Sequence, residues 1–140
     1  MGMNGSFFSN QKTTPMVTSE IAQLPAECNT WRNNLRAFRE EFNQFKLQLQ
    51  NIAGRQKHRE TLLEIEHLNN QFHIQLINIH DLKHAIKLHQ RNISLEEVNN
   101  MGRYSDPLLT HHEELHEEYQ TLSSTLIELR EDFVRFSNAI

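Results

Sequence analysis

The feature that most constrains this chain is a series of apolar residues at alternating steps of four and three. In the first part of the chain the series is unbroken over about 36 residues. Side chains at this spacing share one face of an α-helix, so we predict a helix over about 18–53. Pro25 lies inside it, and the helix therefore either kinks or begins there. Gly54 ends the series, which predicts a hinge near 53–58. The series is Val17, Ile21, Leu24, Cys28, Trp31, Leu35, Phe38, Phe42, Phe45, Leu49 and Ile52.

A second series predicts a helix over about 56–91. It contains Asn69, a polar residue on the apolar seam, where such residues fix helix register at a cost in stability. Further apolar residues flank the seam, so this helix is apolar around more of its circumference than the others. We therefore expect it to be central, or to be engaged on two sides. The series is Leu62, Ile65, Asn69, Phe72, Leu76, Ile79, Lys83 and Ile86, with Leu68 and Leu82 beside it.

The pattern is interrupted after residue 91. Ser94 with Glu97 three residues later has the form of a capping box, which predicts a short extra helix over about 94–101.

A third long helix is predicted over about 107–138. Asp106 suits its N-cap and Pro107 its first position. Its apolar series is His112, Leu115, Tyr119, Leu122, Leu126, Leu129, Phe133, Phe136 and Ile140.

Together these segments predict an all-α fold. Three long helices with short connections favour a long up-down-up antiparallel three-helix bundle of coiled-coil type, forming one domain over 17–140. A long hairpin that completes its core by dimerising is the alternative. The chain has four glycines and three prolines in 140 residues, too few for a turn-rich β fold.

Charge is distributed unevenly along the chain. Helix 18–53 carries the basic stripe Arg32, Arg36, Arg39 and Lys46, whereas the last 49 residues carry ten acidic and three basic side chains. We expect the two to face each other, with Arg32 near Glu118. The net charge of −4 opposes binding to nucleic acid, and no apolar run is long enough for a membrane span. A single cysteine fits a reducing, cytoplasmic compartment.

The N-terminal segment 1–16 is polar and without periodicity, and we expect a disordered tail. Met1-Gly2 with Ser6 matches the N-myristoylation pattern, which we interpret as a chance match.

Histidines cluster on two of the predicted helices. His80 with His84, and His112 with His116, lie four residues apart, so each pair places two imidazoles on one helix face. Residues 112–116 also resemble the H-E-x-x-H motif of zinc metalloproteases. We predict no enzyme, because the motif covers five residues, lacks the further ligand and has no predicted strand beside it. Two E-x-x-H matches, Glu64 to His67 and Glu113 to His116, resemble di-iron bundles but lie at opposite ends of an antiparallel pair.

A simpler metal site remains open. If the second and third helices are antiparallel, His84 and His112 lie near the same level, and His80, His116, Glu27 and Cys28 lie within a turn or two of it. Such ligands suit zinc or iron, and His80, His84, His112 and His116 are the predicted metal ligands of this alternative.

The leading hypothesis is a non-enzymatic interaction module without a cofactor. Exposed apolar edges are typical of helix-mediated association, here with a second copy or with another helical protein. The predicted partner-binding residues are Leu63, Ile74, Ile77, Ile127 and Val134.

Overall fold

The computed structural model describes the backbone of residues 18–140 and the side chains of residues 23–140. It contains three helices, α1 (Thr18–Ala53), α2 (Arg59–Asn99) and α3 (Asp106–Ala139). No strand occurs between residues 18 and 140. The tail 1–16 and the Met1-Gly2 motif lie outside the described residues. The all-α prediction is therefore confirmed for the described part of the chain.

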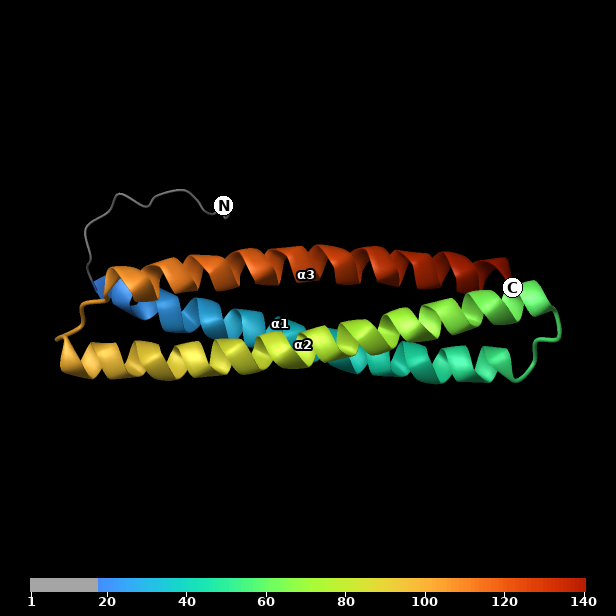
Figure 1. Ribbon diagram of the computed structural model, residues 1–140, viewed down its shortest axis with the longest axis horizontal. Coiled ribbons are helices and arrows are strands. Elements are labelled where there is room, and N and C mark those ends of the chain that lie inside the picture. The colour runs from blue at the N-terminus through green and yellow to red at the C-terminus, as the bar shows by residue number, and fades with distance from the viewer. Residues whose placement is uncertain (1–17) are drawn as a thin grey trace.

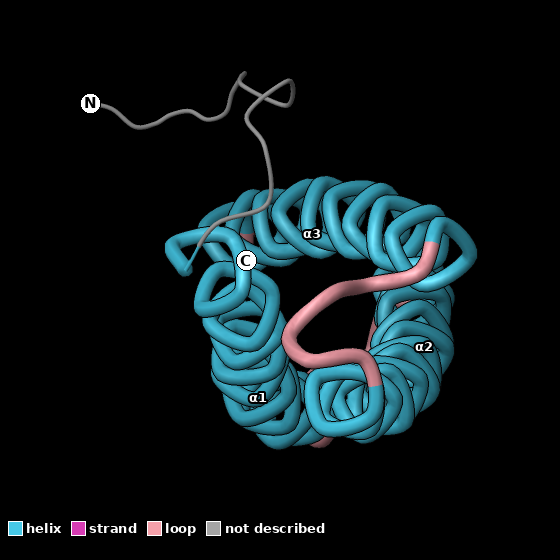
Figure 2. Tube along the Cα trace, turned by 90° about the vertical axis from the view of Figure 1, so that its left-hand side faces the viewer, coloured by secondary structure: helices cyan, strands magenta, loops and turns pink. Residues whose placement is uncertain are grey.

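The three helices lie side by side along the length of the molecule (Figure 1). The α1–α2 connection lies at one end and the α2–α3 connection at the other (Figure 1). Viewed along the helices, α1, α2 and α3 surround a common axis (Figure 2). Each helix thus faces two neighbours, and side chains from all three meet in one core.

Aromatic rings from all three helices fill one half of this core. The centroids of Phe42 on α1 and Phe72 on α2 lie 5.6 Å apart, and those of Phe45 and Phe133 on α3 lie 4.7 Å apart. Phe72 also meets Phe133 edge-on at 5.4 Å. Such pairs add about 0.5–1.5 kcal/mol each beyond their burial, so this cluster ties the three helices together.

Pro25 lies inside α1, seven residues after its first residue. Of the two sequence alternatives, a helix that begins at Pro25 is therefore wrong. The same helix ends at Ala53, and residues 54–58 connect it to α2.

The separate short helix predicted over 94–101 is wrong, because α2 continues without interruption to Asn99. Buried Ile93 extends the apolar face of α2 through this segment. Glu96 and Glu97, the acidic residues of this segment, bind the following loop through hydrogen bonds instead of capping a new helix. Glu96 accepts hydrogen bonds from the backbone N and the Oγ of Ser105, at 2.7 and 2.8 Å, and Glu97 accepts one from Tyr104 Oη.

The turn after α2 uses the left-handed region of the backbone. Met101 has φ 55° and Gly102 has φ 83°. Glycine adopts this conformation without steric cost, and the Gly102 N–H donates to Glu97 O at 3.0 Å, which closes the end of the helix. Ser105, one residue before the predicted Asp106, is the N-cap of α3, and its Oγ accepts from Leu108 N at 3.3 Å.

The buried face of α2 is rotated relative to the predicted seam. Leu62 is exposed and Asn69 and Lys83 are only half-buried, whereas Gln75 and His89 are buried. Because α2 packs against both α1 and α3, its buried stripe is centred on the row that faces the space between them. The buried residues of α2 are Ile65, Leu68, Phe72, Gln75, Ile79, Leu82, Ile86, His89 and Ile93.

The expected pairing of the basic stripe with α3 is also wrong. Arg32 donates to Gln90 of α2 at 2.8 Å, and Lys83 of α2 lies close enough to Arg39 for their charges to repel. An arginine–glutamate pair that joins α1 to α3 has the reverse polarity. Glu41 on α1 receives two parallel hydrogen bonds from the Arg130 guanidinium, the closer at 2.8 Å.

Candidate functional site

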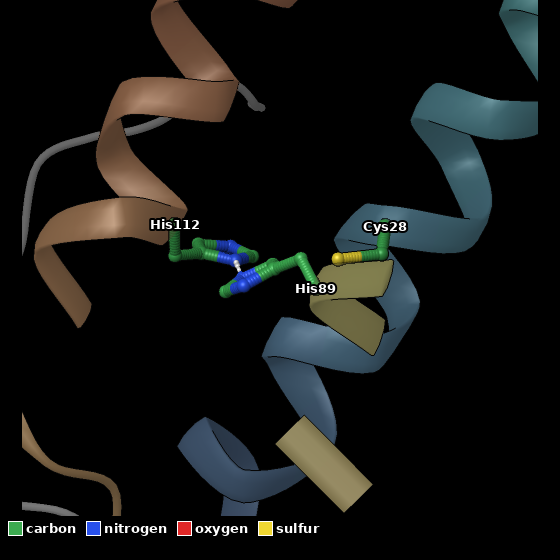
Figure 3. A group of neighbouring side chains, drawn as sticks. All are labelled: Cys28, His89 and His112. Carbon is green, nitrogen blue, oxygen red and sulfur yellow. Dashed lines mark hydrogen bonds between the residues drawn. The ribbon is translucent and has the colours of Figure 1, made fainter. Parts of the chain in front are cut away.

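A cluster of potential metal ligands is buried near the end of the bundle that holds the α2–α3 connection. Cys28 comes from α1, His89 from α2 and His112 from α3, so each helix contributes one side chain (Figure 3). One ligand atom from each residue lies within 4.8 Å of the other two. The exposed fractions are 0%, 1% and 6%, so the cluster is shielded from solvent. We name these three residues the buried triad.

The two histidines of the triad contact each other directly. His89 Nε2 lies 2.9 Å from His112 Nδ1 (Figure 3). The other ring nitrogen of His112, Nε2, lies 2.7 Å from Glu27 Oε1. Because a carboxylate only accepts, His112 Nε2 donates to Glu27. When His112 is neutral, its Nδ1 is then an acceptor, and His89 Nε2 is the donor to it.

This assignment leaves His89 Nδ1 with an unused lone pair. That atom is buried and has no hydrogen-bond partner in the described chain. Buried polar atoms are almost always paired, so an unpaired one calls for an explanation. Burial, followed by the neighbouring His112 and His111, lowers the pKa of His89 to about 4. His89 is therefore neutral near pH 7, the form in which imidazole binds metals.

The surroundings also determine the charge of the other two acids at the site. Burial, followed by the nearby Glu27 carboxylate, raises the pKa of Cys28 to about 12, so the thiol keeps its proton. Burial opposes the ionisation of Glu27, but the hydrogen bonds from His112 and Gln23 outweigh it. They hold the pKa of that carboxyl below its usual value.

The indole of Trp31 forms one wall of the site. Its ring centroid lies 4.8 Å from that of His112 and 5.4 Å from that of His116, which stacks on it nearly in parallel. Tyr119 follows at 5.9 Å, and its Oη accepts a hydrogen bond from Asn34 of α1. Packing therefore fixes the orientation of the His112 ring.

The four histidines predicted as metal ligands are separated in the structure. His112 belongs to the buried triad, and His116 lies beside it against Trp31. His80 and His84 are exposed on α2, with the His80 side chain 82% accessible and paired with Asp81. His80 and His84 are thus not part of the cluster that contains His112.

His89 is the site residue that the sequence interpretation missed. It lies seven residues after Leu82 and fourteen after Gln75, on the row that α2 buries. The seven-residue spacing of Leu68, Gln75, Leu82 and His89 is the signal that could have identified it. Two of its four members are polar, as are two of the neighbouring row Leu62, Asn69, Leu76 and Lys83, so apolar content alone does not distinguish the rows.

The five predicted partner-binding residues are all exposed, between 42% and 50%. Ile74 and Ile77 lie on the side of α2 away from the core. Ile127 and Val134 lie three residues before and four after Arg130, whose guanidinium pairs with Glu41, so they flank the α1-facing side of α3. Leu63 lies near the α1–α2 connection, beside a surface hollow of about 640 Å³.

The described helices contain no segment long and apolar enough to cross a membrane. Comparison of the chain with models of protein families, with curated proteins and with solved structures gave no match.

Proposed function

We propose that this protein is a non-enzymatic, helix-mediated association module that pairs with a second copy of itself through the outer face of α2. The finer topology, an up-down-up antiparallel bundle of coiled-coil type, is part of this proposal. It is supported by the two connections at opposite ends of the molecule (Figure 1). A cytoplasmic location, without nucleic acid or membrane as partner, also belongs to the proposal.

One observation carries it: α2 is apolar on two opposite sides. Opposite its buried face runs a second series at alternating steps of three and four, and all its members are exposed. Val98 is 80% exposed and Leu95 53%. Large apolar side chains exposed along one helix face, here five of the eight members, are typical of an association face. We name it the outer stripe; it consists of Ile74, Ile77, Asp81, His84, Leu88, Arg91, Leu95 and Val98.

The outer stripe is complementary to the same stripe of a second copy that runs in the opposite direction. In an antiparallel pair of α2 helices, each residue meets the one at the same distance from the other end of the stripe. Apolar residues then meet apolar ones at both ends, and the acidic residue meets the basic one. The pairs are Ile74 with Val98, Ile77 with Leu95, Asp81 with Arg91, and His84 with Leu88.

This pattern favours a second copy over an unrelated helix. A two-fold dimer uses the same patch on both subunits, so every pair occurs twice. Arg91 has no acidic partner within the described chain, and the Asp81 side chain is 71% accessible. The stripe spans 25 residues, or ~36 Å of helix at 1.5 Å per residue. The proposal therefore commits to Ile74 and Ile77 among the predicted partner residues, and leaves Leu63, Ile127 and Val134 outside the interface.

The absence of catalysis in this proposal is supported by the geometry of the H-E-x-x-H segment. Both ring nitrogens of His112 are engaged within the core, by His89 and by Glu27. Glu113, which takes the role of general base in such motifs, is exposed on α3. A metal-binding role, the second candidate, is favoured by the buried triad and is argued in the next subsection.

Sedimentation velocity of the full chain over a wide concentration range tests the proposal. We expect a monomer–dimer equilibrium that reaches dimer at high micromolar concentration. Ile77→Glu should abolish the dimer, because it places a carboxylate opposite Leu95 of the second copy. Ile127→Glu is the matched control, since Ile127 is 42% exposed against 47% for Ile77 but lies on α3. A chain that remains monomeric throughout would contradict the proposal.

A charge exchange tests the register. Asp81→Arg and Arg91→Asp should each weaken the dimer, because each places like charges opposite one another. The double variant restores opposite charges and should regain most of the wild-type affinity. If the two effects simply add in the double variant, the antiparallel register is wrong.

A further inference from the structure

We propose that the buried triad of Cys28, His89 and His112 binds a Zn²⁺ ion inside the bundle, with Glu27 as the carboxylate partner of His112. One thiolate and two imidazoles are ligands typical of zinc sites in proteins. This ligand set differs from the four histidines that sequence spacing suggests. It lies within one chain, so it does not depend on the proposed dimer.

The distances suit such a site with small adjustments. In a tetrahedral zinc site, bonds of about 2.0–2.3 Å place neighbouring ligand atoms roughly 3.3–3.7 Å apart. In this structure one ligand atom from each of the three residues lies within 4.8 Å of the other two. Closing the gap requires the three side chains to move together by about 1 Å. It also requires the His89 Nε2–H to leave His112 Nδ1, so that the lone pair of that nitrogen can bind the ion. The three ligands leave a fourth position for a water molecule.

Two groups in the cluster have no hydrogen-bond partner among the described residues. His89 Nδ1 is buried and unpaired. The Cys28 thiol is fully buried and makes no hydrogen bond to any described residue. Both are electron-pair donors that prefer a borderline-soft metal ion. A bound ion takes the lone pair of His112 Nδ1, so coordination bonds replace the hydrogen bond between the two imidazoles.

Glu27 completes the arrangement that zinc-binding histidines generally use. A coordinating imidazole donates its other N–H to a carboxylate or carbonyl, which fixes its tautomer and raises its basicity. Glu27 Oε1 already accepts this bond from His112 Nε2 at 2.7 Å. The distal nitrogen of His112 is therefore held by Glu27, and its Nδ1 is directed toward the triad (Figure 3).

The charges balance as well. When Zn²⁺ binds, the Cys28 thiol releases one proton to solvent and its sulfur donates a lone pair to the ion. Each imidazole stays neutral and keeps its proton on Nε2, so His89 and His112 both bind through Nδ1. The thiolate and the Glu27 carboxylate then carry two negative charges beside the two positive charges of the ion. A buried ion is stabilised only when it is compensated in this way.

Metal titration of the untagged full chain tests the site, with Co²⁺ as a spectroscopic probe and Zn²⁺ as the competing ion. Because the triad is almost inaccessible, each metal is added both to folded protein and during refolding. We expect one Co²⁺ per chain, with a thiolate-to-metal charge-transfer absorption that Zn²⁺ abolishes. This readout uses the wild-type chain and therefore does not depend on a variant that folds. Absence of stoichiometric binding, or bound Co²⁺ without the thiolate absorption, would overturn the proposal.

Two variants locate the site. Cys28→Ala should weaken Zn²⁺ binding by at least 100-fold, and Glu27→Gln by roughly 10- to 100-fold with one ion per chain retained. The matched control is His80→Ala with His84→Ala, which removes two exposed histidines four residues apart and should leave binding unchanged. Loss of binding in this control, with binding intact in Cys28→Ala, would assign the metal to the surface of α2 and refute the buried site.

Discussion

His89 Nε2 lies 2.9 Å from His112 Nδ1, and this contact joins α2 to α3 inside a mainly apolar core. On its other side His112 donates to Glu27, so three helices are connected through one imidazole. The contact places a polar network where the helices approach the α2–α3 connection.

We predict that His112→Ala lowers the free energy of unfolding by about 2–4 kcal/mol in the presence of chelator. The change removes a buried ring and takes away the His112 partner of Glu27 Oε1 and of His89 Nε2. His116→Ala is the control, because His116 is half-buried and stacks on Trp31 without a hydrogen bond; it should cost about 1 kcal/mol. Urea denaturation measures both, and equal losses in the two variants would show that the network adds nothing.

Gln75 places a polar amide side chain within the buried face of α2. Its Oε1 accepts one hydrogen bond, from the exposed Asn78 at 3.1 Å. We predict that Gln75→Leu raises the free energy of unfolding by about 1 kcal/mol, because it buries apolar surface while Asn78 turns to solvent. Gln75→Ala, which removes the amide but leaves a cavity, should instead destabilise the chain. A lower urea midpoint for Gln75→Leu would mean that the amide is needed for packing.

The Glu41–Arg130 pair joins α1 to α3, with both side chains about one-third exposed. The guanidinium also lies 5.3 Å from the centroid of Phe38. A double-mutant cycle with Glu41→Gln and Arg130→Gln should give a coupling energy of about 0.5–1 kcal/mol, which falls as salt is added. Arg130→Lys should lose most of it, because lysine cannot form the two parallel bonds. A coupling that does not respond to salt would argue against an electrostatic origin.

Tyr104 donates to the Glu97 carboxylate across the α2–α3 connection. Burial and this carboxylate raise the pKa of Tyr104 above its usual value. The folded chain therefore holds the phenol proton to higher pH than the unfolded chain, so the stability from Tyr104 is complete below about pH 10 and declines above it.

We predict that Tyr104→Phe costs about 1–3 kcal/mol near pH 7, since the hydrogen bond reaches a charged acceptor. The difference between the variant and the wild type should shrink as the pH rises from 10 to 11. Urea denaturation at both pH values measures this, and a difference that stays constant would contradict the assigned shift.

The buried face of α2 is a feature that the local sequence could not determine. Its helical character follows from apolar periodicity, which is a property of residues within a few turns of each other. Two neighbouring rows on α2, one through Asn69 and Lys83 and one through Gln75 and His89, have similar apolar content. The second row is buried because it faces both α1 and α3, a fact that depends on the positions of distant segments.

The helix break predicted after residue 91 is wrong for a similar reason. Ser94 and Glu97 have the spacing of a capping box, but the carboxylates of Glu97 and its neighbour Glu96 bind Tyr104 and Ser105 in the next loop. Those tertiary contacts satisfy them without a new helix start. Ile93 is also buried, so the apolar face of α2 continues through this segment.

The sequence by itself determined that this chain is helical, roughly where α1 and α3 run, and that Cys28 and His112 lie on their apolar faces, because these properties arise from spacing along a single helix. Only the tertiary structure decided that His89 meets them, that Glu27 orients His112, and that Glu41 rather than the basic stripe pairs with α3. These relationships depend on the rotation of each helix about its axis, which is set by simultaneous packing against two neighbours and is not encoded in any one segment.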